Sequence, residues 1–172
     1  YRYLLDEGMS AQDIAVAGSS AGGGLCLALL VALKDRGMPF PLAALPFSPW
    51  TDLTQSSASI KTRADKDPAL TKPYLDRFAK DYAGKADAHL PTISPLFADF
   101  TGITTSILVQ VGTEEILYDD AERLVQTARA AGLKAELASC EKGFHGWQNL
   151  PVPEARAAAQ RAAAFILSLR PV

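Results

Sequence analysis

The sequence predicts an α/β fold with a mostly parallel sheet and helices on both faces. Short apolar runs of strand length alternate with segments of helical pattern, and the connections are long enough for crossovers. One apolar run also passes through a Gly-Ser-Ser-Ala-Gly turn directly into an apolar helix. With 172 residues, of which 48% are hydrophobic and 21% charged, the chain can bury the core that such a sheet needs.

The first part of the chain is expected to hold two strands with a helix between them. Residues 1–7 have the pattern of a helix end, which Gly8 would cap. Residues 14–17 form an apolar run of strand length, and residues 23–36 are apolar on nearly every side, as in a helix buried against a sheet. Residues 42–47 then predict a second strand.

The middle of the chain is predicted to be a surface loop followed by an amphipathic helix. Residues 54–67 are polar, short and aperiodic, which is typical of a loop that borders a site. The helix would begin at Thr71, whose side chain can cap it, with Pro73 in the first turn. An apolar stripe at helical spacing is expected to pack in the core; it comprises Tyr74, Leu75, Phe78, Ala79 and Tyr82.

Two further strands and two helices are predicted in the last part. Residues 107–111 are an apolar run that closes on a glycine, and residues 134–138 alternate as a strand does. Residues 119–131 and the alanine-rich residues 154–169 have helical patterns. No internal repeat or linker interrupts this order, so we expect a single domain.

Composition and charge favour a small-molecule partner. The net charge is -2 and the lysines and arginines are scattered, so neither nucleic acid nor an anionic membrane surface is a predicted partner. The longest apolar run, residues 25–33, is too short to span a bilayer, and the chain opens without a signal-peptide pattern. We therefore expect a cytoplasmic protein, in which Cys26 and Cys140 are buried free thiols.

The Gly-Ser-Ser-Ala-Gly turn centres on Ser20 and is the strongest candidate site. In a G-x-S-x-G turn between a strand and a helix, glycines such as Gly18 and Gly22 avoid collisions, and the serine hydroxyl is lifted clear of the sheet. The structural alternative is a glycine-rich turn that only opens a helix. A phosphate-binding loop is disfavoured, because G-x-G-x-x-G and a following Gly-Lys-Ser/Thr are both missing.

A serine hydroxyl needs a base to become a strong nucleophile, and histidine titrates near neutrality. The chain contains two histidines. His89 lies in a polar stretch and is interpreted as a solvated surface residue. His145 lies in a loop after the last predicted strand, at the sheet edge where parallel sheets place their sites, so we favour His145 as the base.

The imidazole of such a pair needs a carboxylate on its other nitrogen. The segment that follows the third predicted strand carries four acids. Asp119 and Asp120 are expected to bond the amides at the start of their own helix, whereas Glu114 and Glu115 lie closer to the strand end. No metal site and no cofactor are expected, because the two histidines lie far apart and H-E-x-x-H is absent.

Several motifs in one order identify a family resemblance. The chain resembles the hormone-sensitive-lipase family of α/β-hydrolases, the bacterial family IV carboxylesterases. The resemblance rests on Gly18-Ser19-Ser20-Ala21-Gly22-Gly23-Gly24, Ser48-Pro49-Trp50-Thr51-Asp52-Leu53, Asp67-Pro68-Ala69-Leu70-Thr71, Ile93-Ser94-Pro95-Leu96, the segment from Val111 to Asp120, and His145-Gly146-Trp147-Gln148.

This resemblance implies an α/β-hydrolase fold and a role for each matching residue. Ser20 would be the nucleophile, His145 the general acid and base, and the Ala21 backbone N–H an oxyanion-hole donor. Counting back from the paired aspartates places Glu115 at the catalytic carboxylate, where many relatives carry aspartate. Ser19 is a second departure, because the family usually has Asp or Thr before the nucleophile.

A third departure concerns the extent of the fold. The family carries an HGGG-type loop upstream, which supplies further oxyanion donors, and no His-Gly-Gly occurs here. Residues 1–172 are therefore expected to be the carboxyl-terminal part of one catalytic domain that lacks the amino-terminal strands, with a partial cap-like insertion around 54–97. We expect such a chain to pair with an amino-terminal segment or with another chain.

The expected function is that of a serine carboxylesterase, which hydrolyses a small-molecule ester through an acyl-enzyme intermediate. A non-catalytic ligand-binding relative and an inactive fragment are the alternatives.

Overall fold

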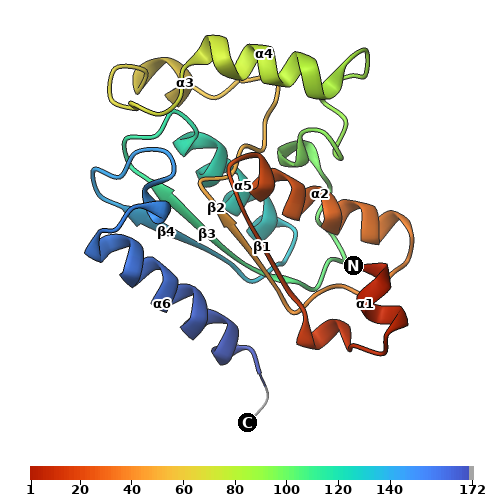
Figure 1. Ribbon diagram of the computed structural model, residues 1–172. Coiled ribbons are helices and arrows are strands. Elements are labelled where there is room, and N and C mark those ends of the chain that lie inside the picture. Colours follow the sequence, from red (N-terminus) through yellow and green to blue (C-terminus); the bar gives the residue numbers. More distant parts are fainter. Residues whose placement is uncertain (171–172) are drawn as a thin grey trace.

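The computed structural model describes residues 1–170, so the last two residues of the expected domain, Pro171 and Val172, lie outside the described residues (Figure 1). The four strands form one parallel sheet in the order β1-β2-β3-β4. The strands are β1 (Ala15–Ser19), β2 (Ala43–Phe47), β3 (Ser106–Gly112) and β4 (Ala135–Cys140). The α-helices are α1 (Arg2–Asp6), α2 (Ala21–Asp35), α3 (Ser59–Thr62), α4 (Lys72–Ala83), α5 (Tyr118–Ala130) and α6 (Pro153–Ser168). The predicted α/β class with a parallel sheet is confirmed.

Helices cover both faces of the sheet. α2 and α5 pack on one face, where Leu30 and Leu124 contact a cluster that includes Ile107 of β3. α6 packs on the other face through Phe165, against a cluster that includes Leu108. Adjacent residues of β3 thus enter different cores, which explains why this strand is buried along nearly its whole length.

β1 lies at an edge of the sheet and is less buried than β3. Its backbone pairs with β2, and the side chains of Ala15 and Ala17 are exposed. The unpaired groups of an edge strand form a template for another strand. The expectation that β1 pairs with a further segment remains a prediction.

The region between β2 and β3 differs from the sequence-based prediction. Residues 54–67 are not a plain surface loop, because they contain helix α3 and the side chains of Ser57, Ser59 and Ile60 are buried. Ser57 and Ser59 have hydrogen-bond partners among the acids in the first turn of α5, so a polar segment can be buried here at low cost.

The prediction for α4 was also wrong in part. Leu75 and Ala79 are buried, but Tyr74, Phe78 and Tyr82 remain 58%, 51% and 57% exposed. α4 lies above the carboxyl end of the sheet, apart from the main core (Figure 1). The side chain of Thr71 makes no capping hydrogen bond.

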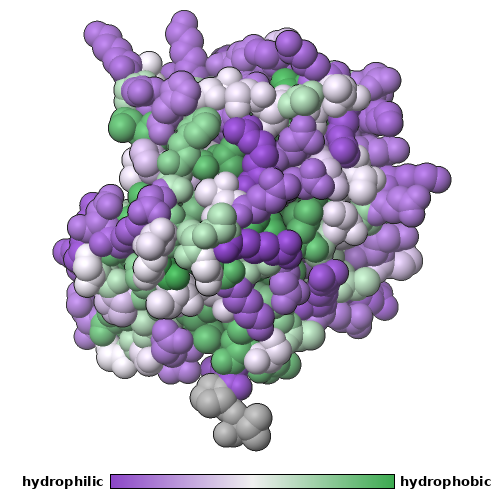
Figure 2. Space-filling model, turned by 180° about the vertical axis from the view of Figure 1, so that it is seen from behind, coloured by the Kyte–Doolittle hydropathy of each residue, from purple (hydrophilic) through white to green (hydrophobic). Residues whose placement is uncertain are grey.

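Within residues 1–170, no helix is both long enough and apolar enough to cross a membrane. Figure 2 shows hydrophilic side chains interspersed with smaller hydrophobic areas on the face opposite to the view of Figure 1. Cys26 is buried as expected, whereas Cys140 is only half-buried.

Candidate active site

Ser20 occupies a sharp turn between β1 and α2. Its backbone has φ 56° and ψ -121°, a conformation that L-residues rarely adopt. Its N–H donates to the Phe47 carbonyl at 2.9 Å, and its carbonyl accepts from the Trp50 N–H at 3.0 Å. The last residue of β2 and the segment after it therefore hold the backbone of this strained residue through both its N–H and its carbonyl.

The glycines around Ser20 serve different purposes. A Cβ on Gly18 would lie 2.3 Å from the Gly22 carbonyl oxygen, so only glycine fits at this position. A Cβ on Gly22 would meet no atom within 4 Å, which corrects the expectation that both are needed to avoid collisions. Gly23 and Gly24 are also restricted to glycine. A Cβ on Gly23 would lie 2.8 Å from the Pro49 Cβ, and a Cβ on Gly24 would lie 2.3 Å from the Trp50 carbonyl oxygen.

His145 lies beside Ser20 at the carboxyl edge of the sheet. Its Nε2 atom is 2.9 Å from the Ser20 hydroxyl oxygen, and its Nδ1 atom is 3.2 Å from Oε2 of Glu115. The imidazole side chain is 9% exposed and the Glu115 side chain is fully buried. The three side chains thus form a chain of polar contacts from the cavity mouth into the interior. Such an arrangement can move a proton from the hydroxyl to the imidazole.

The loop that bears His145 packs closely on the end of β3. A Cβ on Gly112 would lie 2.2 Å from the Gly143 carbonyl oxygen, and the Glu114 N–H donates to that same oxygen at 2.9 Å. The backbone of Glu114 therefore supports the loop, while the Glu115 side chain meets the ring. His89 lies elsewhere, exposed and paired with Asp87 at 3.0 Å.

Two donors hold the other carboxylate oxygen of Glu115. Oε1 accepts from the Ser48 hydroxyl at 2.6 Å and from the Gly112 N–H at 2.6 Å. A buried carboxylate without such partners would be costly, so these contacts stabilise Glu115 in place. Gln148 extends the contacts, because its Nε2 atom donates to the Ser48 oxygen at 3.0 Å.

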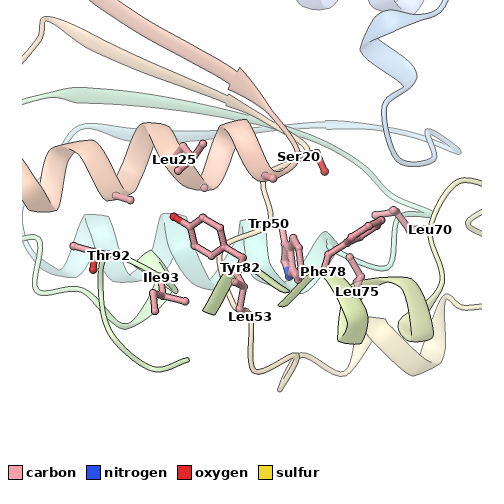
Figure 3. Close-up of a pocket in the computed structure, with 13 residues that line it drawn as sticks. Ser20, Leu25, Trp50, Leu53, Leu70, Leu75, Phe78, Tyr82, Thr92 and Ile93 are labelled. Carbon is pink, nitrogen blue, oxygen red and sulfur yellow. The ribbon is translucent and has the colours of Figure 1, made fainter. Parts of the chain in front are cut away.

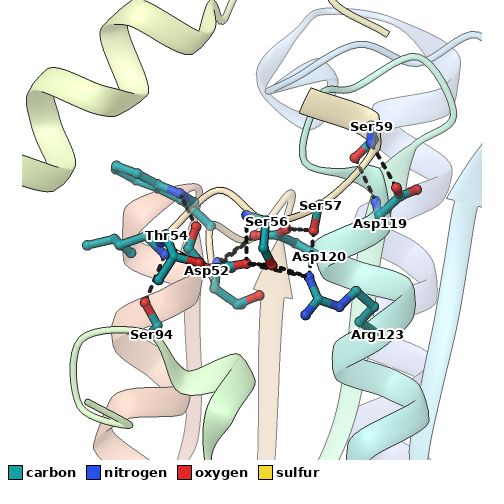
Figure 4. Close-up of polar contacts among 12 residues, drawn as sticks. Asp52, Thr54, Ser56, Ser57, Ser59, Ser94, Asp119, Asp120 and Arg123 are labelled. Atoms are coloured by element: carbon teal, nitrogen blue, oxygen red, sulfur yellow. Dashed lines mark hydrogen bonds and ion pairs between the residues drawn. The ribbon is translucent and has the colours of Figure 1, made fainter. Parts of the chain in front are cut away.

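Asp119 and Asp120 have another role than the one predicted. Asp120 accepts from the backbone N–H groups of Thr51 and Asp52 at 3.2 and 3.0 Å, and Asp119 accepts from the Ser59 N–H at 2.8 Å (Figure 4). Both acids therefore fasten the segment after β2 rather than the start of α5. Burial raises the pKa of Asp120 to about 7, and the nearby charge of Asp52 adds to the rise.

A cavity of about 440 Å³ opens at Ser20 and runs between α2 and α4. Figure 3 shows Leu25 of α2 facing Tyr82 across it, with Trp50 and Phe78 nearer to Ser20. The lining is almost entirely apolar; it comprises Ser20, Ala21, Gly24, Leu25, Ala28, Trp50, Leu53, Leu70, Leu75, Phe78, Tyr82, Thr92 and Ile93. Phe78 and Tyr82 thus form a cavity wall, which corrects the expectation of core packing for these two residues, whereas Leu75 is buried as expected and also borders the cavity.

Sequence reasoning assigned no role to Ser48 or Gln148. Ser48 follows β2 directly, and Gln148 lies in a short 3-10 helix (Trp147–Asn149) after β4. The carboxyl ends of parallel strands meet at one edge of a sheet, so the positions of Ser48 and Gln148 after strands were the available signal. Within the described residues, no group of three or more His, Cys, Asp or Glu side chains is arranged to hold a metal ion.

Comparisons with known proteins identify the family and support the fold. A family model described as the alpha/beta hydrolase fold matches residues 1–149. The acetyl-hydrolase of Streptomyces hygroscopicus is 40% identical over 168 residues, which are 96% of this chain and 56% of that protein. An esterase of Acinetobacter venetianus is 34% identical over 98% of this chain and 56% of its own length. The chain thus spans little more than half the length of these relatives.

Solved structures are similar over the same extent. The structure of EstE5 soaked with p-nitrophenyl butyrate has a TM-score of 0.94 and 39% identity, over 98% of this chain and 57% of that one. An esterase from the bacterial hormone-sensitive lipase family has a TM-score of 0.94 and 40% identity, over 96% of this chain and 56% of its own. The chain therefore belongs to the hormone-sensitive-lipase family of α/β-hydrolases.

Proposed function

We propose that the protein is a serine carboxylesterase in which Ser20, His145 and Glu115 form the catalytic triad. One observation carries the proposal: the Ser20 hydroxyl lies 2.9 Å from His145 Nε2 at the mouth of an apolar cavity, and the buried Glu115 lies on the other ring nitrogen. Esterases and an acetyl-hydrolase among the relatives support the same reaction class.

In the first half-reaction, the Ser20 oxygen attacks the ester carbonyl carbon while its proton passes to His145 Nε2. The Glu115 carboxylate stabilises the resulting imidazolium through Nδ1. The tetrahedral intermediate then collapses, the bond to the alkoxy oxygen breaks, and the leaving alcohol takes the proton from His145. Water releases the acid from the acyl-serine by the same steps in the second half-reaction.

The negative oxygen of the tetrahedral intermediate needs hydrogen-bond donors. Ala21 is the first residue of α2, and the first N–H groups of a helix have no acceptor within it. The Ala21 N–H is therefore available as an oxyanion donor, and the positive end of the helix dipole favours the same charge. The apolar cavity between α2 and α4 would hold the hydrocarbon part of the ester.

The test is covalent labelling and hydrolysis with the protein at its full natural length. Ser20→Ala should abolish labelling by a fluorophosphonate and remove the initial burst of p-nitrophenol from p-nitrophenyl butyrate. Ser19→Ala is the matched control and should keep both, because Ser19 ends β1 one residue before the turn. Equal labelling of the Ser20→Ala protein would move the nucleophile elsewhere. Ester binding without turnover by the unchanged protein would favour a ligand-binding role.

A further inference from the structure

Three side-chain contacts join the segments after β2, β3 and β4: Ser48 with Glu115, Ser48 with Gln148, and Glu115 with His145. The backbone between His145 and Gln148 closes this ring. We propose that Ser48 and Gln148 are positioning residues, which hold the Glu115 carboxylate in the orientation that meets His145. This inference rests on the proposed esterase function, because it assigns Glu115 to the support of the imidazole.

The direction of each hydrogen bond in the ring follows from the available protons. Ser48 has one hydroxyl proton, which it donates to Glu115 Oε1 at 2.6 Å. The Ser48 oxygen can then only accept from Gln148 Nε2 at 3.0 Å. Gln148 follows His145 by three residues, so the ring returns to the loop that bears the imidazole. A rotation of the Glu115 carboxylate would break its contacts with Ser48 and His145 together.

The backbone of Ser48 is a second and independent observation. Ser48 is fully buried and has φ 43°, in the left-handed region that favours glycine. It also precedes Pro49, and a following proline restricts the backbone further. Its N–H donates to the Gln110 carbonyl at 2.7 Å, which helps to hold this conformation. Strained residues of this kind persist where the surrounding structure fixes them, and they cluster at functional sites.

The segment of residues 47–50 contacts both Ser20 and Glu115 of the proposed triad. Phe47 and Trp50 bond the backbone of Ser20, while Ser48 between them bonds the carboxylate of Glu115. One four-residue segment thus sets the position of the nucleophile relative to the acid. A purely stabilising role for Ser48 would affect unfolding and leave turnover unchanged, whereas a positioning role would lower kcat.

The experiment compares kcat, KM and thermal unfolding in two variants. Ser48→Gly removes the hydroxyl while glycine adopts the positive φ without strain. Gln148→Met keeps the side-chain length but cannot donate. With p-nitrophenyl butyrate, kcat should fall about 10- to 100-fold in Ser48→Gly and about 3- to 10-fold in Gln148→Met. KM should stay within about twofold, because neither residue lines the cavity.

Matched controls separate positioning from folding. Ser59→Ala removes a buried serine hydroxyl that donates to the Ile116 carbonyl at 2.7 Å, and Gln126→Met changes an exposed side chain of α5. Both controls should keep kcat. If the unchanged protein lacks esterase activity, both the proposed function and this inference are contradicted. If the unchanged protein is active and both Ser48→Gly and Gln148→Met keep its kcat, the inference alone is overturned.

Discussion

Glu115 and Asp120 are two buried carboxylates only five residues apart, yet their surroundings differ. Glu115 lies in the segment between β3 and α5, and Asp120 lies in the first turn of α5. Each is at most 1% exposed and each has three hydrogen-bond partners. One partner of Glu115 is an imidazole, which can take up a proton. The partners of Asp120 are neutral backbone and hydroxyl groups. The hydrogen-bond partner, rather than burial, thus decides whether a buried carboxylate is suited to support proton transfer or to hold a loop in place.

The largest expected effect on turnover comes from removing the charge of Glu115. Glu115→Gln keeps the shape of the side chain but loses the charge that stabilises an imidazolium, so kcat should fall about 10³- to 10⁴-fold. Thermal unfolding should change little, because the amide oxygen can still accept from Ser48 and Gly112. Full turnover in a folded Glu115→Gln protein would contradict the role proposed for this residue.

Asp120→Asn tests the role of the second carboxylate through the pH dependence of the unfolding free energy. The pKa of Asp120 is about 7 in the folded protein and about 3.9 in an unfolded chain, so the folded state retains the proton over that interval. The stabilisation from this proton is complete below about pH 4 and is lost as pH rises towards 7. The slope is at most about 1.4 kcal/mol per pH unit for one proton.

Asn mimics the protonated acid, and the Ser57 hydroxyl can accept from its amide. The Asp120→Asn protein should therefore unfold with nearly equal free energy from pH 4.5 to pH 8 and be more stable than the unchanged protein at pH 8. Urea unfolding at several pH values measures this. Parallel pH curves for the two proteins would show that Asp120 does not carry the dependence.

The smallest effect is expected at Arg123, which binds the same loop from its exposed side. Its Nη1 atom lies 3.0 Å from both Ser56 Oγ and Ser57 Oγ and 3.4 Å from Asp52 Oδ2 (Figure 4). Because the guanidinium is 39% exposed, water screens the ion pair. Arg123→Gln should lower the unfolding free energy by about 1 kcal/mol or less and leave kcat unchanged. A loss of several kcal/mol would make Arg123 a central support of this loop.

The order of strands and crossover helices could be predicted because it follows from local patterns. Apolar runs and helical periods lie within single segments, and the bounds of the strands differ from the prediction by at most two residues. Ser20 and His145 could be found for a similar reason, since a turn motif and a loop after a strand identify them.

The predictions that the structure corrects concern side chains whose contact partners lie far away in the sequence. A helical stripe has the same period whether it faces a core or a cavity, so the sequence could not distinguish these roles for Phe78 and Tyr82. Acids at a helix start normally bond their own helix, but the segment after β2 supplies the donors for Asp119 and Asp120. Ser48 depends on Glu115, 67 residues away, and no local pattern encodes that contact.

The close approaches at Gly18, Gly24 and Gly112 have a consequence for how this protein can be altered. At each position a backbone oxygen lies 2.2 to 2.3 Å from where a Cβ would stand, so any side chain there would displace main chain. The cavity walls are different, because Leu25 and Tyr82 are 54% and 57% exposed and have room to change size. Laboratory evolution of substrate range should therefore draw its useful diversity from α2 and α4, while libraries placed at those glycines should yield few folded clones.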